Sequence, residues 1–222
     1  MKKLSIMLLL VSLFSATLLN AGYEQDRKVL TSAKILQDAL KAPKTGITKN
    51  LLHNAKAIAV FPNTQKAAFF IGGRRGKGVL CIKNVDGSWS QPIFVDLQGL
   101  SAGLQFGFKA SDLIVIFKTE RSLDNLSEGK ITIGLNGGAV AIAKGVGGGV
   151  ETDKNLAGDL YNSQKSSGLF VGLSIAGATI IINDEDNFDY YDRLVYIDDI
   201  LANDITKEKS ETKKLKKALS SF

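Results

Sequence analysis

The sequence predicts an α+β protein, in which a strongly curved antiparallel sheet or a partly closed β-barrel has N- and C-terminal helices packed against it. Three observations predict this fold. A helical apolar pattern occupies residues 23–42, short apolar runs separated by turn residues follow from residue 57, and a helical pattern returns at residue 187. The 222 residues are enough for one sizeable core, so we expect a single domain with short extensions.

Residues 1–21 have the pattern of a secretory signal peptide. Lys2 and Lys3 precede an apolar run of about eleven residues, and the segment ends in the small residue Ala21. A membrane-anchoring helix is the alternative, but the run is shorter than the roughly 20 residues of a membrane span. We therefore expect an exported protein, periplasmic or secreted. It is not expected to be a lipoprotein, because the only cysteine, Cys81, lies far from the cleavage point.

The first element after the signal peptide is a predicted helix at 23–42. Val29, Ala33, Leu36 and Leu40 form one apolar stripe at helical spacing, so this helix is expected to pack on the core. A second short helix is expected at 45–56, separated from the first by Pro43.

Six short strands are expected next, because apolar runs alternate with turn residues. Their short connections imply antiparallel pairing, since parallel neighbours need long crossovers. The expected strands are 57–61, 66–73, 76–84, 90–99, 102–110 and 112–119.

The second half of the chain completes the sheet and returns to helix. A helical turn is expected at 121–130, glycine-rich strands at 131–151, further strands at 157–164, 167–177 and 178–184, and helix at 187–204. We therefore divide the chain into a signal peptide (1–21), a domain (22–204) and a basic C-terminal tail or amphipathic helix (205–222).

The segment GGRRGKGVL, residues 72–80, joins glycines and cations. It is not a P-loop, because that motif needs glycine where Ile71 stands and a hydroxyl residue where Gly78 stands. A dinucleotide fingerprint also fails, since no strand-helix-strand alternation surrounds the glycines. We interpret the segment as a β-hairpin that presents Arg74, Arg75 and Lys77. An ordinary solvated turn is the alternative.

Several separated motifs resemble the SYLF domain family. They are AKAIAVFP (55–62), GGRRGKGVL (72–80), DGSWSQP (86–92), the GxQxG and SDL elements within 103–113, and SGLFVG (167–172) with Tyr161 upstream. The resemblance covers roughly residues 30–192. Two positions depart from the family pattern: Thr48 stands where proline is frequent, and Asp192 stands where glycine commonly follows the paired tyrosines.

The resemblance implies a protein without enzymatic activity that binds membrane lipids, with phosphoinositides and actin as partners of eukaryotic members. An exported protein would meet neither actin filaments nor phosphoinositides, so actin is not expected as a partner. The transferable property is affinity for anionic phospholipid, and peripheral association with a membrane surface is expected.

Charge and the C-terminal pattern agree with weak binding to an anionic surface. The net charge is +6, and removing Lys2 and Lys3 leaves about +4, which does not indicate nucleic acid. Arg74, Arg75 and Lys77 are the expected headgroup ligands. A membrane-contact helix is expected in the tail, with a frayed soluble tail as the alternative; its residues are Lys213, Lys214, Leu215, Lys216, Lys217, Leu219 and Phe222.

Catalytic, metal and cofactor sites have little support. His53 is the only histidine, which excludes a multi-histidine metal site within one chain, and Cys81 lies in a strand-like run typical of a buried residue. Residues 183–189 are acidic, but Phe188 stands where a calcium loop needs glycine. Adjacent Asp198 and Asp199 cannot face each other across a substrate as an acid/base pair. No cofactor is expected.

Two functions remain open. The first is a non-enzymatic lipid-binding protein of the exported compartment. The second is a structural or interaction module whose glycine-rich strands bind another polypeptide or a second copy. An outer-membrane barrel is disfavoured, because the lysine-rich C-terminus does not fit a lipid-facing strand.

Overall fold

The computed structural model describes residues 22–41, 53–117, 119–123, 126–132, 140–143, 160–168, 178–202, 205 and 208–221. Within the strands it describes the backbone alone over several stretches, including 66–72 and 100–111. The expected signal peptide, most of the second short helix, the glycines of 131–151 and the strand segment 169–177 lie outside the described residues.

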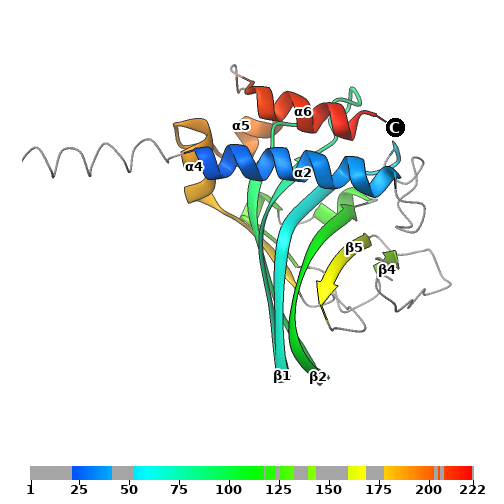
Figure 1. Ribbon diagram of the computed structural model, residues 1–222. Coiled ribbons are helices and arrows are strands. Elements are labelled where there is room, and N and C mark those ends of the chain that lie inside the picture. Colours follow the sequence, from blue (N-terminus) through cyan, green and yellow to red (C-terminus); the bar gives the residue numbers. More distant parts are fainter. Residues whose placement is uncertain are drawn as a thin grey trace, which may run out of the picture.

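Helix α2 (Tyr23–Lys41) is the first expected helix, and the structure confirms it. Val29, Ala33 and Leu36 of its apolar stripe are buried, as their spacing along one face of a helix predicts. The helix lies across one face of the sheet, beside the C-terminal helix (Figure 1). It therefore forms one layer of the fold.

Two long strands take the place of the six short ones. β1 (Ala57–Ile82) and β2 (Ile93–Phe117) pair antiparallel along nearly their whole length. The register of this pair shifts at residues 61–64 and again at residues 69–71 of β1. The expected break after Phe61 thus coincides with an irregularity inside a continuous strand, because a β-bulge bends a strand without ending it.

Strand β1 folds back on itself. Gly76 lies against Thr64, and Gly78 lies against Val60 and Phe61, whereas a straight strand would hold residues 60 and 78 roughly 60 Å apart. The ends of β1 also meet, since the Lys83 backbone N–H donates to the Lys56 carbonyl at 2.8 Å. We call residues 57–65 the first limb of β1 and residues 76–82 its second limb. Figure 1 shows the β1–β2 pair extending away from the helices.

Strands β5 and β6 attach to β2, and β4 and β3 extend the sheet beyond them. The six strands of the described residues form one sheet in the order β3-β6-β2-β5-β4, and β1 also pairs with β2. The pairs are antiparallel except β4 with β5, which is parallel. The expected curved antiparallel sheet with terminal helices, an α+β fold, is confirmed. The bounds are β3 (Lys130–Thr132), β4 (Val140–Ala143), β5 (Leu160–Gly168) and β6 (Thr179–Ile182).

Near the helices, the described side chains of β1 are buried on both faces of the sheet, because alternate strand residues point to opposite sides. Ala57, Ala59 and Phe61 enter one core with the end of β2 and with residues 195–205. Ile58 and Val60 enter a second core beneath α2 and the C-terminal helix. This two-sided burial explains why the strand sequences read as continuous apolar runs rather than as a polar alternation.

The helices after β6 are short. Helix α4 (Asp184–Tyr191) begins at Asn183, whose side-chain oxygen accepts a hydrogen bond from the Asp186 backbone N–H at 2.8 Å. It ends at Asp192, which has a positive φ of 55°. α5 (Ile197–Leu201) follows, so the helix expected at 187–204 is divided in two. Two 3-10 helices, η1 (Glu120–Leu123) and η2 (Leu126–Glu128), occupy the expected helical turn.

Helix α6 (Ser210–Leu219) is the amphipathic helix expected in the tail. It lies beside α2 (Figure 1), and its buried Thr212 hydroxyl is 2.7 Å from the Tyr190 hydroxyl. The Lys209 ammonium lies 4.3 Å from the centre of the Tyr190 ring and pairs with Asp26 at 3.1 Å. These contacts make α6 part of the folded domain. Among the described helices, none combines the length and the apolar character that crossing a bilayer requires.

Candidate functional site

The basic segment 72–80 lies inside β1 and not at the tip of a hairpin. The tip of the β1–β2 hairpin is at residues 84–88, where the Asn84 backbone N–H donates to the Ser88 carbonyl at 2.8 Å and Gly87 has a φ of +84°. The interpretation of residues 72–80 as a β-hairpin is therefore wrong, and so is the alternative of a solvated turn, because these residues pair continuously with β2. Gly76 and Gly78 in this segment serve a close approach between two limbs of one strand instead of a tight turn.

Strand alternation separates the glycines of the second limb from its cations. Gly76 and Gly78 are buried and face the first limb, where a Cβ on Gly76 would come within 2.7 Å of Thr64 Oγ1. Arg75 and Lys77 alternate with them and are exposed. The G-K-G spacing thus serves two purposes, since it packs the strand inward and presents cations outward. The side chain of Arg74 lies outside the described part of the chain.

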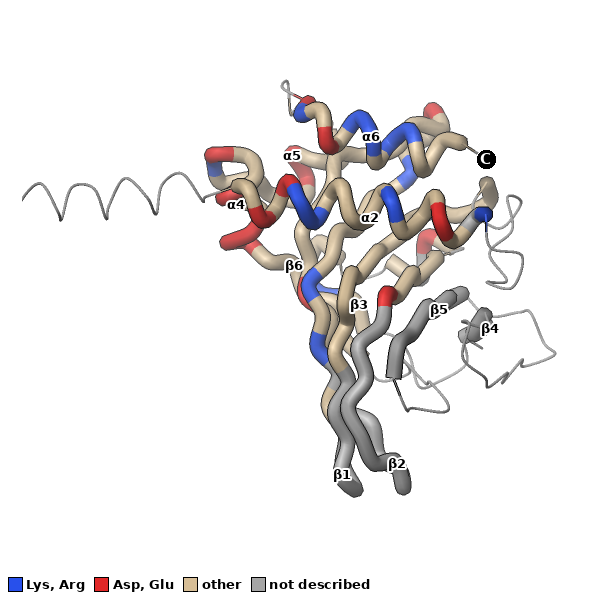
Figure 2. The backbone as a smooth tube through the Cα atoms, in the orientation of Figure 1, with Lys and Arg blue, Asp and Glu red and all other residues tan. Residues whose placement is uncertain are grey.

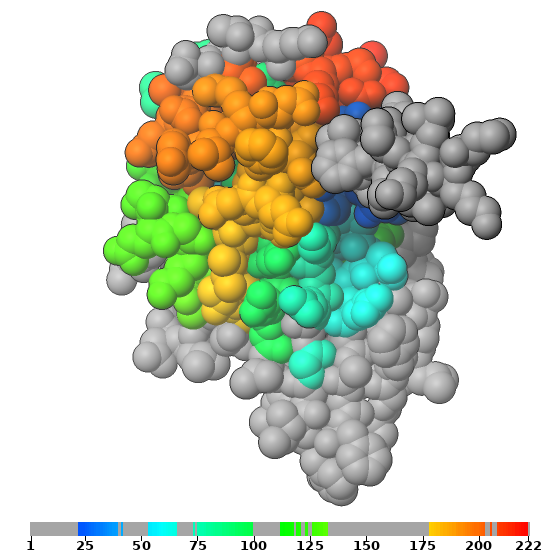
Figure 3. Space-filling view, turned by 90° about the vertical axis from the view of Figure 1, so that its left-hand side faces the viewer, coloured from blue at the N-terminus to red at the C-terminus, as the bar shows by residue number. Residues whose placement is uncertain are grey.

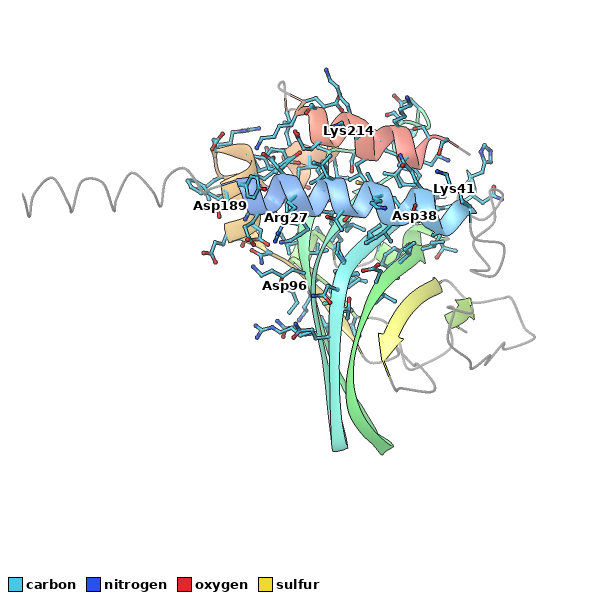
Figure 4. The ribbon with its side chains drawn as sticks, in the orientation of Figure 1. Arg27, Asp38, Lys41, Asp96, Asp189 and Lys214 are labelled. Atoms are coloured by element: carbon cyan, nitrogen blue, oxygen red, sulfur yellow. The ribbon has the colours of Figure 1, made fainter. Side chains whose placement is uncertain are left out.

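Arg75 and Lys77 enter an open groove between α2 and β1, with a volume of about 750 Å³. Four of its lining side chains are cationic and one is a carboxylate. Figure 2 shows basic positions on α2 and on the stretch of β1 below it, and Figure 4 labels Arg27 on α2. We call this the α2–β1 groove; its lining residues are Glu24, Arg27, Lys28, Thr31, Pro62, Asn63, Gln65, Arg75, Gly76 and Lys77.

Asp186 of α4 binds two of the lysines that line the groove. Its carboxylate pairs with Lys28 at 2.8 Å and with Lys77 at 3.2 Å, and its side chain is only 8% exposed. Burial by itself would raise the pKa of this carboxyl, but the hydrogen bonds and charges of Lys28 and Lys77 outweigh it and hold the pKa below its usual value. Asp186 therefore stays ionised at neutral pH and fixes both ammonium groups.

Arg75 and Arg27 are the two exposed guanidinium groups of the groove. Among the described residues no ion pair is formed by Arg75. Arg27 reaches Glu24 at 3.6 Å, but both side chains are about two-thirds exposed, so solvent screens this pair strongly. The arrangement favours an anion that accepts hydrogen bonds from guanidinium groups.

Sequence reasoning missed the contributions of α2 and α4 to this groove. Arg27 and Lys28 are ordinary charged residues of an amphipathic helix, and Asp186 lies within a generally acidic segment. No spacing rule joins these positions to residue 75, because the folding of β1 under α2 brings them together. The local signal that could be read was the alternation of glycines and cations in 72–80.

The C-terminal residues expected to contact a membrane are arranged differently. Leu215 and Leu219 of α6 are 1% and 2% exposed, and they belong to the second core together with apolar residues of α2. Lys213, Lys214 and Lys217 are exposed, while Lys216 pairs with Glu208 at 2.8 Å. The expectation that these two leucines contact lipid is therefore wrong, because their apolar surface is already buried in the protein. Phe222 lies outside the described residues.

The residues considered above as catalytic or metal-binding candidates have ordinary structural contacts. Cys81 is buried, and burial raises the pKa of its thiol to about 12, so the thiolate that a nucleophile requires is not populated at neutral pH. His53 is exposed, and its backbone carbonyl accepts from Lys83 Nζ at 2.7 Å. Asp199 accepts from the Tyr196 backbone N–H at 2.9 Å. Across the described ranges, no group of three or more potential ligands could hold a metal ion.

Comparisons with known proteins place this fold in a family. Residues 98–222 match the sequence model of the Ysc84 family, described as "Las17-binding protein actin regulator". The chain is 30% identical over 200 residues to SH3 domain-containing YSC84-like protein 1 of Bos taurus. The alignment covers 86% of this chain and 57% of that protein, and the human protein aligns to the same extent.

A yeast relative is also similar. LAS seventeen-binding protein 3 of Saccharomyces cerevisiae is 33% identical over 155 residues, which cover 65% of this chain and 32% of that protein. The chain thus spans little more than half the length of the animal relatives and a third of the yeast one. None of these names denotes an enzyme. The resemblance read from the separated motifs is confirmed, and the chain belongs to the Ysc84 family of SYLF domain proteins.

Proposed function

We propose that this chain is a non-enzymatic lipid-binding protein of the exported compartment, and that it holds anionic phospholipid headgroups in the α2–β1 groove. The observation that supports this proposal most is Arg75, an exposed guanidinium without an ion-pair partner among the described residues, in a groove that also holds Arg27. A planar guanidinium donates two parallel hydrogen bonds to a phosphate, which favours a phosphate headgroup over a simple halide.

The expected affinity is modest. Each cation near an anionic bilayer contributes roughly 1 kcal/mol, and Asp186 already neutralises part of the charge of Lys28 and Lys77. Binding should therefore weaken strongly with salt, because exposed charges are screened over about 10 Å at 0.1 M ionic strength. Peripheral and reversible membrane association fits this balance.

The location is proposed from residues 1–21 alone, which have the order of a secretory signal peptide. An exported chain would meet the anionic phospholipids of that compartment and not actin filaments. The actin-regulating role in the family description is therefore not proposed for this chain.

A protein partner is the second candidate, because relatives are named for binding Las17. The earlier expectation was that glycine-rich strands let another polypeptide approach. Gly76 and Gly78 do not support it, since the first limb of β1 already fills the space beside them. The glycines between residues 134 and 149 lie outside the described residues.

Liposome flotation tests the lipid proposal. The chain from residue 22 onward is mixed with vesicles of phosphatidylcholine, or of phosphatidylcholine with phosphatidylglycerol, at low and high salt. We expect flotation only with the anionic vesicles at low salt, and we expect Arg75→Glu to abolish most of it. The matched control is Lys130→Glu, which reverses an exposed charge on β3 outside the groove.

Two results would overturn the proposal. One is equal flotation with neutral and anionic vesicles, because headgroup charge would then be irrelevant. The other is an equal loss in Lys130→Glu and Arg75→Glu, which would assign binding to overall charge and not to the groove. Unchanged far-UV circular dichroism shows that each variant is folded.

A further inference from the structure

The segment from α4 through α5 exposes large apolar side chains. The described residues include seven exposed large hydrophobic residues, and four of them fall between residues 188 and 201. Single exposed apolar residues are normal, but a concentration of them indicates a binding surface. We call these four residues the α4–α5 surface: Phe188 (48% exposed), Leu194 (65%), Tyr196 (69%) and Leu201 (43%).

These exposed residues alternate along the segment with buried apolar ones. Tyr190, Val195 and Ile200 of the same segment are buried in the cores, so the fold already has its apolar anchors here. Leu194 and Tyr196 are exposed on either side of buried Val195, and the backbone at Tyr196 is extended. In extended backbone, residues two apart point to the same side. Figure 3 shows α4 in gold and the following segment in orange next to each other on one face of the molecule.

The charge around this surface is opposite to that of the α2–β1 groove. Besides buried Asp186, residues 184–201 contain six acidic residues and one basic residue, in a chain whose net charge is +6. Asp184, Glu185, Asp192 and Asp198 are exposed, and Figure 2 shows acidic positions gathered on α4 and near α5. An anionic membrane would be repelled by these carboxylates, although apolar side chains are present.

We propose that the α4–α5 surface binds a basic, amphipathic polypeptide segment of a protein partner. Its apolar side chains would pack on Leu194 and Tyr196, and its lysines or arginines would lie near the surrounding carboxylates. Such charge complementarity speeds association and selects against acidic partners. This inference is independent of the proposed lipid function, because the two surfaces carry opposite charge and share no lining residue.

The test uses the chain from residue 22 onward and two fluorescent synthetic helical peptides. Both peptides have the same amphipathic pattern of leucines, and the polar positions are lysine in one and glutamate in the other. Fluorescence anisotropy should show at least tenfold tighter binding of the lysine peptide. The double variant Leu194→Ser plus Tyr196→Ser should weaken that binding at least tenfold. The control Val85→Ser removes a fully exposed side chain at the tip of the β1–β2 hairpin and should leave binding unchanged.

Further measurements distinguish a protein partner from a membrane and from a second copy of the chain. Unchanged binding of the lysine peptide by the double variant, or an equal loss in Val85→Ser, would overturn the proposal. Loss of liposome flotation in the double variant would assign this surface to membrane, and dissociation of an oligomer in light scattering would assign it to a second copy; either also overturns it. Arg75→Glu should remove flotation and spare peptide binding, so the two proposals fail separately.

Discussion

Gly78 lies against the backbone carbonyl and side chain of its own strand, at Val60 and Phe61. A Cβ at residue 78 would collide with the Val60 carbonyl oxygen, which belongs to the backbone and cannot move aside without disturbing the sheet. The contact explains why residue 78 is a glycine. It also holds the second limb of β1 where Arg75 and Lys77 can enter the groove below α2.

Replacing Gly78 by alanine is therefore expected to destabilise the protein by about 3 kcal/mol, because the added methyl group overpacks the contact between the limbs. Urea unfolding measures the change in the free energy of unfolding. Gly73→Ala is the matched control, since nothing lies within 4 Å of the position of its Cβ, and its effect should stay within about 0.5 kcal/mol. Equal effects at the two positions would contradict the close approach of the limbs.

Asp186→Asn should lower the free energy of unfolding by about 2 kcal/mol at neutral pH, because it removes the partner of partly buried Lys28. Because the pKa of Asp186 is lowered in the folded state, its contribution is fully present above the unfolded value of about 3.9. It is lost as the pH falls through the lower pKa of the folded state.

The difference between wild type and Asp186→Asn should therefore shrink as the pH falls below about 4. Thermal or urea unfolding at a series of pH values measures it. Asp198→Asn, at an exposed carboxylate, should show no comparable difference at any of these pH values. A difference that stays constant down to acid pH would show that the charge of Asp186 is not what stabilises its contacts with Lys28 and Lys77.

Tyr190→Phe should cost about 1–2 kcal/mol, because it leaves the buried hydroxyl of Thr212 without its partner at 2.7 Å. Adding Thr212→Val should recover part of that loss, since both polar groups are then removed together. A double-mutant cycle in urea measures the coupling. Strictly additive losses would mean that the two hydroxyls do not interact.

Leu215→Ala should destabilise the domain by about 3 kcal/mol, because this α6 side chain is 1% exposed in the second core. Lys214→Ala on the exposed side of the same helix should change stability by less than about 0.5 kcal/mol. Urea unfolding compares the two variants. A small effect of Leu215→Ala, together with reduced liposome flotation, would return α6 to the role of a membrane contact.

The sequence by itself determined the α+β class, the stripe of α2, the amphipathic character of 210–219 and the family, because these depend on local periodicity and on motifs that keep their order along the chain. Only the tertiary structure decided that the six apolar runs of 57–119 join into two long, bent strands. The sequence does not distinguish a bulge from a turn, because the same residue types occur in both. The tertiary structure also decided that Leu215 and Leu219 face protein and that Arg27, Lys28 and Asp186 join Arg75 and Lys77. An amphipathic helix has the same pattern whether a membrane or a protein covers it, and contacts between distant segments depend on how the chain folds back.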